Sequence, residues 1–202
     1  MTSLLDQSAL LQLADRLVAA ARRAGADAAD VVAVRSMSLS VEIRDGAIEE
    51  SQRSEADDVG LRVLIGRRQA VVSTNDLKAD VAQLAERAMA MAKVAPEDRF
   101  AGLADPAQLA RDTPDLDLID PDLPSVAALE ERAKAAEAAG LAVKGVTKSE
   151  GASASAGIGG MVLATSHGFR GAYLNSRHSV SMSAIAGEGT AMERDYDFSS
   201  TL

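Results

Sequence analysis

The 202-residue chain has no cysteine, no tryptophan and only two histidines. Without thiols it can form neither the disulfide framework of a small secreted domain nor a thiolate metal site. Aromatic residues make up 2% of the chain and hydrophobic residues 47%, so aliphatic side chains and alanine must fill the interior. A reducing compartment suits this composition, and we expect a cytoplasmic protein.

Long apolar runs are also missing. The first residues, Met1 to Asp6, do not combine a basic stretch with an apolar one, as a secretory leader would. No window approaches the roughly 18 apolar residues that a membrane-spanning helix requires. We therefore expect no membrane association.

Positive charge is scarce, with 21 basic against 30 acidic residues and a formal net charge of −9. The adjacent arginines, Arg22 with Arg23 and Arg67 with Arg68, are isolated pairs and form no basic stripe. A phosphate backbone would be repelled by such a chain. Direct binding of nucleic acid is not expected.

Hydrophobic periodicity predicts an α+β fold with antiparallel sheets and amphipathic helices packed on one face. Apolar residues recur at helical spacing over residues 8–24, and Gly25 follows as a stop. A second helix, capped by Asn75 or Asp76, should bury residues at helical spacing. These residues are Leu77, Val81, Leu84, Ala88 and Met91.

Alternation of period two predicts an antiparallel meander after the first helix. Asp45-Gly46 is a strong hairpin signal, and Gly66-Arg67 marks a second turn. The predicted strands cover residues 37–44, 47–53, 59–65 and 69–73. The strand at 37–44 should have one face exposed to solvent.

All five prolines lie between residues 95 and 124, together with several aspartates. We read this stretch as a boundary or a surface strap. The predicted domains are an N-terminal α+β domain at 1–95, a Pro/Asp-rich linker at 96–124 and the start of a second, β-rich α+β domain at 125–202. This second unit is incomplete, because its pattern leaves a sheet edge and an apolar face uncovered, and we expect the natural chain to continue.

The second unit should begin with a helix at 126–139, capped by Ser125 and ended by Gly140. Strands separated by glycine-bearing turns should follow at 141–149, 152–164 and 168–186. The last of these has one buried face, which includes His178. A turn at Glu188-Gly189 then precedes an acidic and aromatic end at 193–198.

Motifs that carry chemistry are absent from the pattern. His167 and His178 belong to no His-Glu-x-x-His helix, and we place the first in a turn and the second, with its polar atoms satisfied, on a strand. The small residues at 151–160 fit a strand, turn and strand better than a phosphate cradle. No serine lies in a Gly-x-Ser-x-Gly elbow. No residue is assigned as catalytic, cofactor-binding or metal-binding.

Six blocks of sequence stand out by their order and spacing, at residues 58–63, 66–70, 73–77, 149–154, 164–169 and 194–198. Together they resemble the TldD/PmbA family, and the PmbA (TldE) branch more than the TldD branch. The resemblance implies an assembly of two subunits, in which the TldD-type chain carries a His-Glu-x-x-x-His zinc motif and the PmbA-type chain lacks it. That motif belongs to the C-terminal half of the family's proteins, so no zinc is expected in this chain.

The resemblance also implies a function in proteolysis of unfolded peptides. On this hypothesis the chain is part of a non-catalytic subunit that helps to enclose the substrate beside a TldD-like partner, and an exposed strand edge could accept the peptide. The alternative is a protein-binding modulator without a role in hydrolysis, with DNA gyrase among the candidate partners and an acidic surface that imitates DNA. A third alternative, an independent hydrolase that uses paired carboxylates, has little support from spacing.

Overall fold

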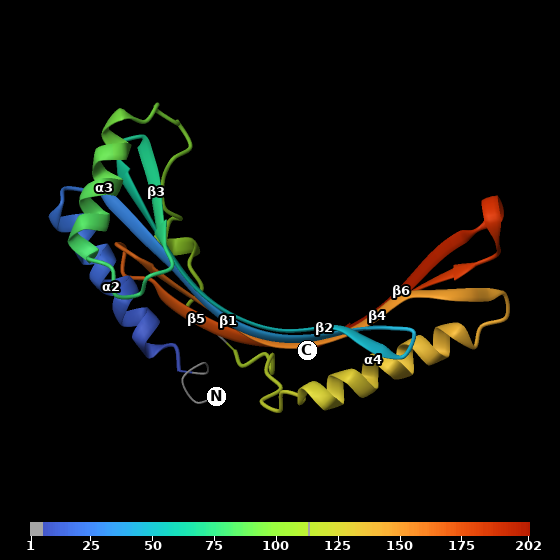
Figure 1. Ribbon diagram of the computed structural model, residues 1–202. Helices are drawn as coiled ribbons and strands as arrows, with labels where there is room; N and C mark the ends of the chain where they lie inside the picture. The colour runs from blue at the N-terminus through green and yellow to red at the C-terminus, as the bar shows by residue number, and fades with distance from the viewer. Residues whose placement is uncertain (1–5, 113) are drawn as a thin grey trace. The chain divides into compact units, whose positions relative to one another are not determined.

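The computed structural model describes residues 6–112 and 114–202. It confirms the α+β class. Within these residues one antiparallel six-stranded sheet has the order β3-β2-β1-β4-β5-β6 (Figure 1). The strands are β1 (Ala28–Arg44), β2 (Ala47–Ile65), β3 (Arg68–Thr74), β4 (Val146–Thr165), β5 (Arg170–Ala186) and β6 (Glu193–Thr201). The helices are α2 (Ser8–Arg23), α3 (Val81–Val94) and α4 (Val126–Leu141), with short 3-10 turns at Pro106–Gln108 and Gly189–Ala191.

Several strands are longer than predicted. The segments at 47–53 and 59–65 are one strand, β2, and those at 141–149 and 152–164 are one strand, β4, which begins only at Val146. The prediction of a turn between the latter two was wrong. Gly151 has φ +133° and stays within β4, where Ser149 and Ala152 are both buried. In a regular strand one residue separates neighbouring side chains of the same face, but two residues separate Ser149 from Ala152. This extra residue is a β-bulge.

The predicted turns are confirmed at both hairpins of the meander. Asp45 and Gly46 have φ values of +51° and +75°, as the two central residues of a type I′ turn require. Gly66 has φ +56° between β2 and β3. Val59 to Ile65 on β2 then pairs with Arg68 to Thr74 on β3 in antiparallel register.

Contacts divide the chain into two compact units. Unit 1 comprises residues 1–36, 56–116 and 159–174, and unit 2 comprises residues 37–55, 117–158 and 175–202. Strands β1, β2, β4 and β5 each contribute residues to both units. The boundaries predicted at 95 and 124 stay a prediction.

The core of unit 1 lies between its sheet strands and helices α2 and α3, which contact each other. Helix α2 agrees with the prediction, with Gly25 at φ +99° just beyond it. The predicted cap of α3 was wrong: Asp80, not Asn75 or Asp76, accepts from the Ala82 and Gln83 N–H groups. Asp76 instead accepts from the Lys78 N–H in a local turn.

The later start of α3 also changes its buried face. The fully buried residues are Ala85, Ala88, Met89 and Ala92, whereas Met91 is 42% exposed. Leu77, Val81 and Leu84 pack only partly against the core. Small residues on this face fit the close approach of α2 and α3.

The core of unit 2 lies between α4 and one face of the strands (Figure 1). It is made by Leu129, Ala133, Val41, Ile43, Ala154 and Ala156. Ser125 caps α4 as predicted, with its hydroxyl accepting from the Ala128 N–H over 3.2 Å. The predicted stop at Gly140 was wrong, because α4 continues to Leu141. A Cβ at Gly140 would lie 2.5 Å from Met182 Sδ, so glycine here gives room to that side chain.

The Pro/Asp-rich stretch contains one short 3-10 turn and otherwise no helix or strand among its described residues. It is nevertheless held by backbone hydrogen bonds. In unit 1 the Asp98 N–H donates to the Arg67 carbonyl over 2.8 Å. In unit 2 the Ser176 N–H donates to the Leu118 carbonyl over 2.9 Å, and the Ser176 hydroxyl accepts from the Asp120 N–H. The segments around Asp98 and around Leu118 to Asp120 are therefore each attached to the rest of their unit, as a surface strap would be.

Candidate functional site

Among the described residues, β6 is the last strand in the sheet order and has a strand on one side only. It pairs with β5 in antiparallel register, with Asp195 opposite Ala184 and Asp197 opposite Met182. Cross-strand partners share a face. Both carboxylates therefore lie on the face that α4 covers, as Met182 does.

A groove of about 510 Å³ runs between α4 and strands β5 and β6. Its floor is apolar and its outer wall is formed by β6. It is lined by Ala136, Ala139, Gly140, Val143, Val146, Val180, Ser181, Met182, Ala184, Asp195, Tyr196, Asp197, Phe198 and Ser199. Val143 is 59% exposed, so part of the apolar floor is open to solvent.

The two aspartates have only local hydrogen bonds. Asp195 Oδ1 accepts from the Tyr196 N–H over 2.9 Å, and Asp197 Oδ1 accepts from the Phe198 N–H over 2.8 Å. Within the described ranges neither carboxylate forms a salt bridge. The groove thus combines apolar walls with uncompensated negative charge.

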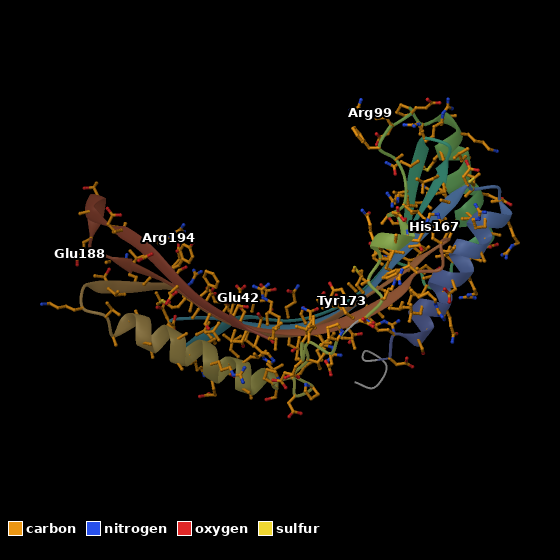
Figure 2. The ribbon with its side chains drawn as sticks, turned by 180° about the vertical axis from the view of Figure 1, so that it is seen from behind. Glu42, Arg99, His167, Tyr173, Glu188 and Arg194 are labelled. Carbon is orange, nitrogen blue, oxygen red and sulfur yellow. The ribbon has the colours of Figure 1, made fainter. Side chains whose placement is uncertain are left out.

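The opposite face of β6 carries Arg194, Tyr196 and Phe198. Tyr196 is 68% and Phe198 63% exposed, and their cross-strand partners are Ser183 and Ser181. Arg194 forms a salt bridge of 3.2 Å with Glu150 of β4. Figure 2 shows Arg194 and Glu42 on the side of the strands away from α4.

A second, smaller hollow of about 290 Å³ lies in unit 2 beside Glu42, Glu49, Glu150, Ser181 and Ser183. Its charges are largely paired with arginines: Arg44 lies 3.2 Å from Glu49, and Arg194 neutralises Glu150. This hollow has a polar lining that leaves little to bind an apolar ligand. The groove beside β6 is the better candidate.

Glu137 is the one acidic side chain buried in unit 2, with 3% exposure. Its carboxylate accepts from the Asp45 N–H over 2.9 Å, from the Gly46 N–H over 2.7 Å and from the Ser149 hydroxyl. Burial by itself would raise the pKa of Glu137, but these hydrogen bonds outweigh it and hold the pKa below the ordinary value of 4.5. The charge anchors the β1–β2 turn to α4.

The two histidines occupy the predicted kinds of structure. His167 lies exposed in the turn between β4 and β5, and His178 lies on β5. The expectation that His178 is fully satisfied was wrong. Its Nε2 is buried and lies 3.4 Å from Asp120 Oδ2 but makes no hydrogen bond.

The family resemblance raises the question of zinc, which prefers four converging nitrogen, sulfur or oxygen donors. No three His, Asp or Glu side chains converge as a metal site would need within residues 6–112 and 114–202. His178 has a single acidic neighbour, and thiols are absent. The residues present do not fit a zinc ion.

The small residues at 151–160 are part of β4 and allow close backbone approach. A Cβ at Gly157 would lie 2.9 Å from the Met37 carbonyl oxygen of β1. A structural role for these glycines is thus supported.

None of the helices among the described residues has the length and apolar character needed to cross a membrane.

Sequence reasoning missed the groove because three distant segments build it. It noted the acidic and aromatic end after Glu188-Gly189 but did not predict a strand there. The alternation Asp195, Tyr196, Asp197, Phe198 was the available signal, since a period of two is typical of a strand.

Comparisons with known proteins agree with this architecture. Residues 29–92 match the family model described as PmbA/TldA metallopeptidase domain 1, and residues 119–202 match the PmbA/TldA metallopeptidase central domain. The chain is 35% identical over 174 residues to metalloprotease PmbA of Escherichia coli O157:H7, which covers 85% of this chain and 39% of that protein. It is 35% identical over 195 residues to a metalloprotease PmbA homolog of Haemophilus influenzae, covering 96% and 43%.

Solved structures of other proteins have a similar fold. A protein of Bacteroides thetaiotaomicron, described as a candidate modulator of DNA gyrase, superposes with a TM-score of 0.86 at 25% identity, over 95% of this chain and 44% of that one. TldE of Thermococcus kodakarensis superposes with a TM-score of 0.75 at 14% identity, over 93% and 42%, and shows the shared fold. The chain spans about two fifths of the length of these proteins.

Proposed function

The chain belongs to the PmbA/TldD metallopeptidase family, and we propose that it forms the first and central domains of a PmbA (TldE)-like subunit that acts in the proteolysis of unfolded peptides. In this proposal the subunit is non-catalytic and assembles with a TldD-like partner. In this proposal the zinc is held by the TldD-like partner, which carries the His-Glu-x-x-x-His motif that the family resemblance implies.

The observation that carries the proposal is the match of residues 29–92 and 119–202 to the first and central domains of the PmbA/TldA metallopeptidases. Among the described residues, β6 has a strand on one side only and lies beside an apolar groove. An unfolded peptide has unpaired backbone N–H and C=O groups, and an edge strand offers the complementary groups. Pairing of this kind is largely independent of side chains, so it suits a subunit that receives varied, extended substrates. The groove adds apolar surface next to the peptide backbone.

The test uses the full-length protein that carries this chain and the TldD-like protein of the same genome, purified separately and mixed. We expect cleavage of a fluorescently labelled unfolded protein by the mixture and none by the PmbA-like protein alone. Atomic emission should detect zinc in the purified TldD-like protein and not in the PmbA-like protein. An inactive mixture, or chelator-sensitive cleavage by the PmbA-like protein alone, would contradict the proposal.

A second candidate is a non-enzymatic modulator of DNA gyrase. It is favoured by the description of the Bacteroides thetaiotaomicron protein and by the net charge of −9. An acidic protein can compete with DNA for a basic surface. Titration calorimetry with gyrase should then give a complex that weakens as salt rises, and absence of heat at low salt would rule this candidate out.

A further inference from the structure

We propose that Asp45-Gly46 is a site of spontaneous isoaspartate formation and that Glu137 suppresses this reaction in the folded protein. The inference goes beyond the proposed function and does not depend on it. It concerns the tip of the β1–β2 hairpin and its hydrogen bonds to α4, all of which lie within unit 2.

The first step concerns the sequence. Asp45-Gly46 is the only aspartate followed by glycine in the chain, and both residues are exposed. Glycine has no Cβ, so its backbone rotates freely and its nitrogen can approach the preceding side chain without a steric penalty. An aspartate before glycine is therefore the kind of aspartate most prone to ring closure between its side chain and the backbone.

The second step concerns the chemistry. The Gly46 nitrogen attacks the side-chain carboxyl carbon of Asp45 in its acid form, so that an N–C bond forms and a C–O bond breaks. The amide hydrogen and the carboxyl OH leave as water, and a cyclic imide remains. Addition of water at the side-chain carbonyl restores aspartate. Addition at the former main-chain carbonyl gives isoaspartate, and the overall composition is unchanged.

The third step concerns the nitrogen that has to react. The Gly46 N–H donates to Glu137 Oε2 over 2.7 Å, and the Asp45 N–H donates to Oε1 over 2.9 Å. Ring closure takes the hydrogen from the Gly46 nitrogen, so it removes one donor from a buried carboxylate. A hydrogen bond to a charged group that is lost on the way to the transition state slows a reaction by about tenfold to a hundredfold.

The negative charge of Glu137 acts in the same direction. Its side chain is buried and its pKa is below the ordinary value, so it is ionised at neutral pH. The amide nitrogen becomes nucleophilic as it gives up its proton and gains negative charge. A carboxylate 2.7 Å away disfavours that charge.

The turn itself shows what the modification would change. Asp45 and Gly46 have the positive φ values of a two-residue type I′ turn, which sets the pairing of β1 with β2. Isoaspartate places an additional carbon in the backbone, so neither N–H would keep its position. The modified hairpin should therefore detach from Glu137.

The experiment follows isoaspartate at residue 45 in the full-length protein that carries this chain, kept at neutral pH for several weeks. Peptide mapping with endoproteinase Asp-N measures it, because this enzyme cleaves before aspartate and not before isoaspartate. The same protein in guanidinium chloride gives the rate without the folded turn. Circular dichroism establishes that each variant is folded.

We expect isoaspartate to form at least about tenfold more slowly in the folded than in the unfolded protein. Glu137→Gln removes the charge and one acceptor, and it should speed the reaction in the folded protein about tenfold. Glu131→Gln removes an exposed charge from the same helix and should leave the rate within about twofold of the parent. Asp80→Ala should do the same, although it removes the cap of α3 in unit 1 and lowers stability.

Equal rates in the folded and unfolded protein, or an unchanged rate in Glu137→Gln, would overturn the inference. So would equal acceleration by Asp80→Ala and Glu137→Gln, because global unfolding would then expose the turn.

If Glu137→Gln does not fold, amide hydrogen exchange of the unmodified protein decides. Protection of the Gly46 N–H supports the inference, and exchange as fast as in a short peptide of the same sequence overturns it. Cleavage by the mixed subunits is a separate measurement, so its failure would remove the proposed function and leave this inference standing.

Discussion

The Gly46 N–H donates to Glu137 Oε2 over 2.7 Å, which joins the tip of the β1–β2 hairpin to helix α4. The Asp45 N–H donates to the other carboxylate oxygen, and the Ser149 hydroxyl donates to it as well. Two donors of the β1–β2 turn and one donor of β4 thus depend on one side chain. This arrangement orients α4, the inner wall of the groove.

Replacement of Glu137 by glutamine should destabilise the protein by about 1 to 3 kcal/mol. The amide NH₂ of glutamine would face N–H donors at one of the two positions where the carboxylate accepts. Chemical denaturation in urea at neutral pH measures the change. Glu131→Gln, an exposed position on the same helix, is the matched control and should change stability by less than about 0.5 kcal/mol.

The stabilisation by Glu137 should also depend on pH. Its pKa in the folded protein is below the ordinary value of 4.5, so the unfolded chain binds a proton more readily. The contribution is therefore complete above the unfolded pKa and is lost as pH falls through the folded pKa. The difference in unfolding free energy between the parent and Glu137→Gln should be constant near pH 7 and shrink below about pH 4.5. A difference that grows on acidification would contradict the assignment.

Asp80→Ala should cost about 0.5 to 2 kcal/mol, because Asp80 accepts from two N–H groups at the start of α3. Asp76→Ala should cost less, since Asp76 accepts only from the Lys78 N–H in the preceding turn. Thermal unfolding followed by circular dichroism compares the two. If Asp76 were the more costly site, α3 would begin where the sequence alone suggested.

The ion pair between Arg62 and Asp30 should couple more strongly than that between Arg53 and Glu55. Arg62 Nε donates to Asp30 Oδ1 over 3.0 Å, and the Asp30 side chain is 15% exposed. The second pair is about 60% exposed at both side chains. Double-mutant cycles to alanine should give at least about 1 kcal/mol for the first pair and 0.2 to 1 kcal/mol or less for the second.

Gly157→Ala should destabilise the protein, although alanine in a strand is ordinarily better than glycine. The added Cβ would lie 2.9 Å from the Met37 carbonyl oxygen, so backbone must move. Urea denaturation measures the effect, with Ser155→Ala on the same strand as control. A stabilised Gly157→Ala protein would show that β1 and β4 can separate here without cost.

Local signals predicted the elements that depend on neighbouring residues. The spacing of Leu10, Leu13 and Leu17 gives α2 its buried face, and Ser125 caps α4 as its position suggests. The Asp45-Gly46 turn needs positive φ at both residues, which these residue types tolerate. Such features require no knowledge of distant segments.

Elements with weak alternation were missed. The first half of β1 has Val31 and Ala33 buried but Val32 and Val34 more than a third exposed, so both faces are apolar and the period is hidden. The length of β2 was underestimated because residues 54–58, which join the two predicted strands, are mostly polar, and the strand is exposed from Ala47 to Ala56. The groove could not be predicted because its walls come from α4, β5 and β6, and their juxtaposition depends on sheet order.

The bulge at Gly151 has a consequence for how this fold tolerates insertions. Side chains alternate between faces, so a single extra residue in a strand reverses every later position until the strand ends. In β4 the bulge between Ser149 and Ala152 accommodates one extra residue, so that the side chains on both sides of it point to the same buried face. Lineages of this fold should therefore gain or lose strand residues in pairs, and a solitary insertion should survive only beside a glycine that can take up the kink.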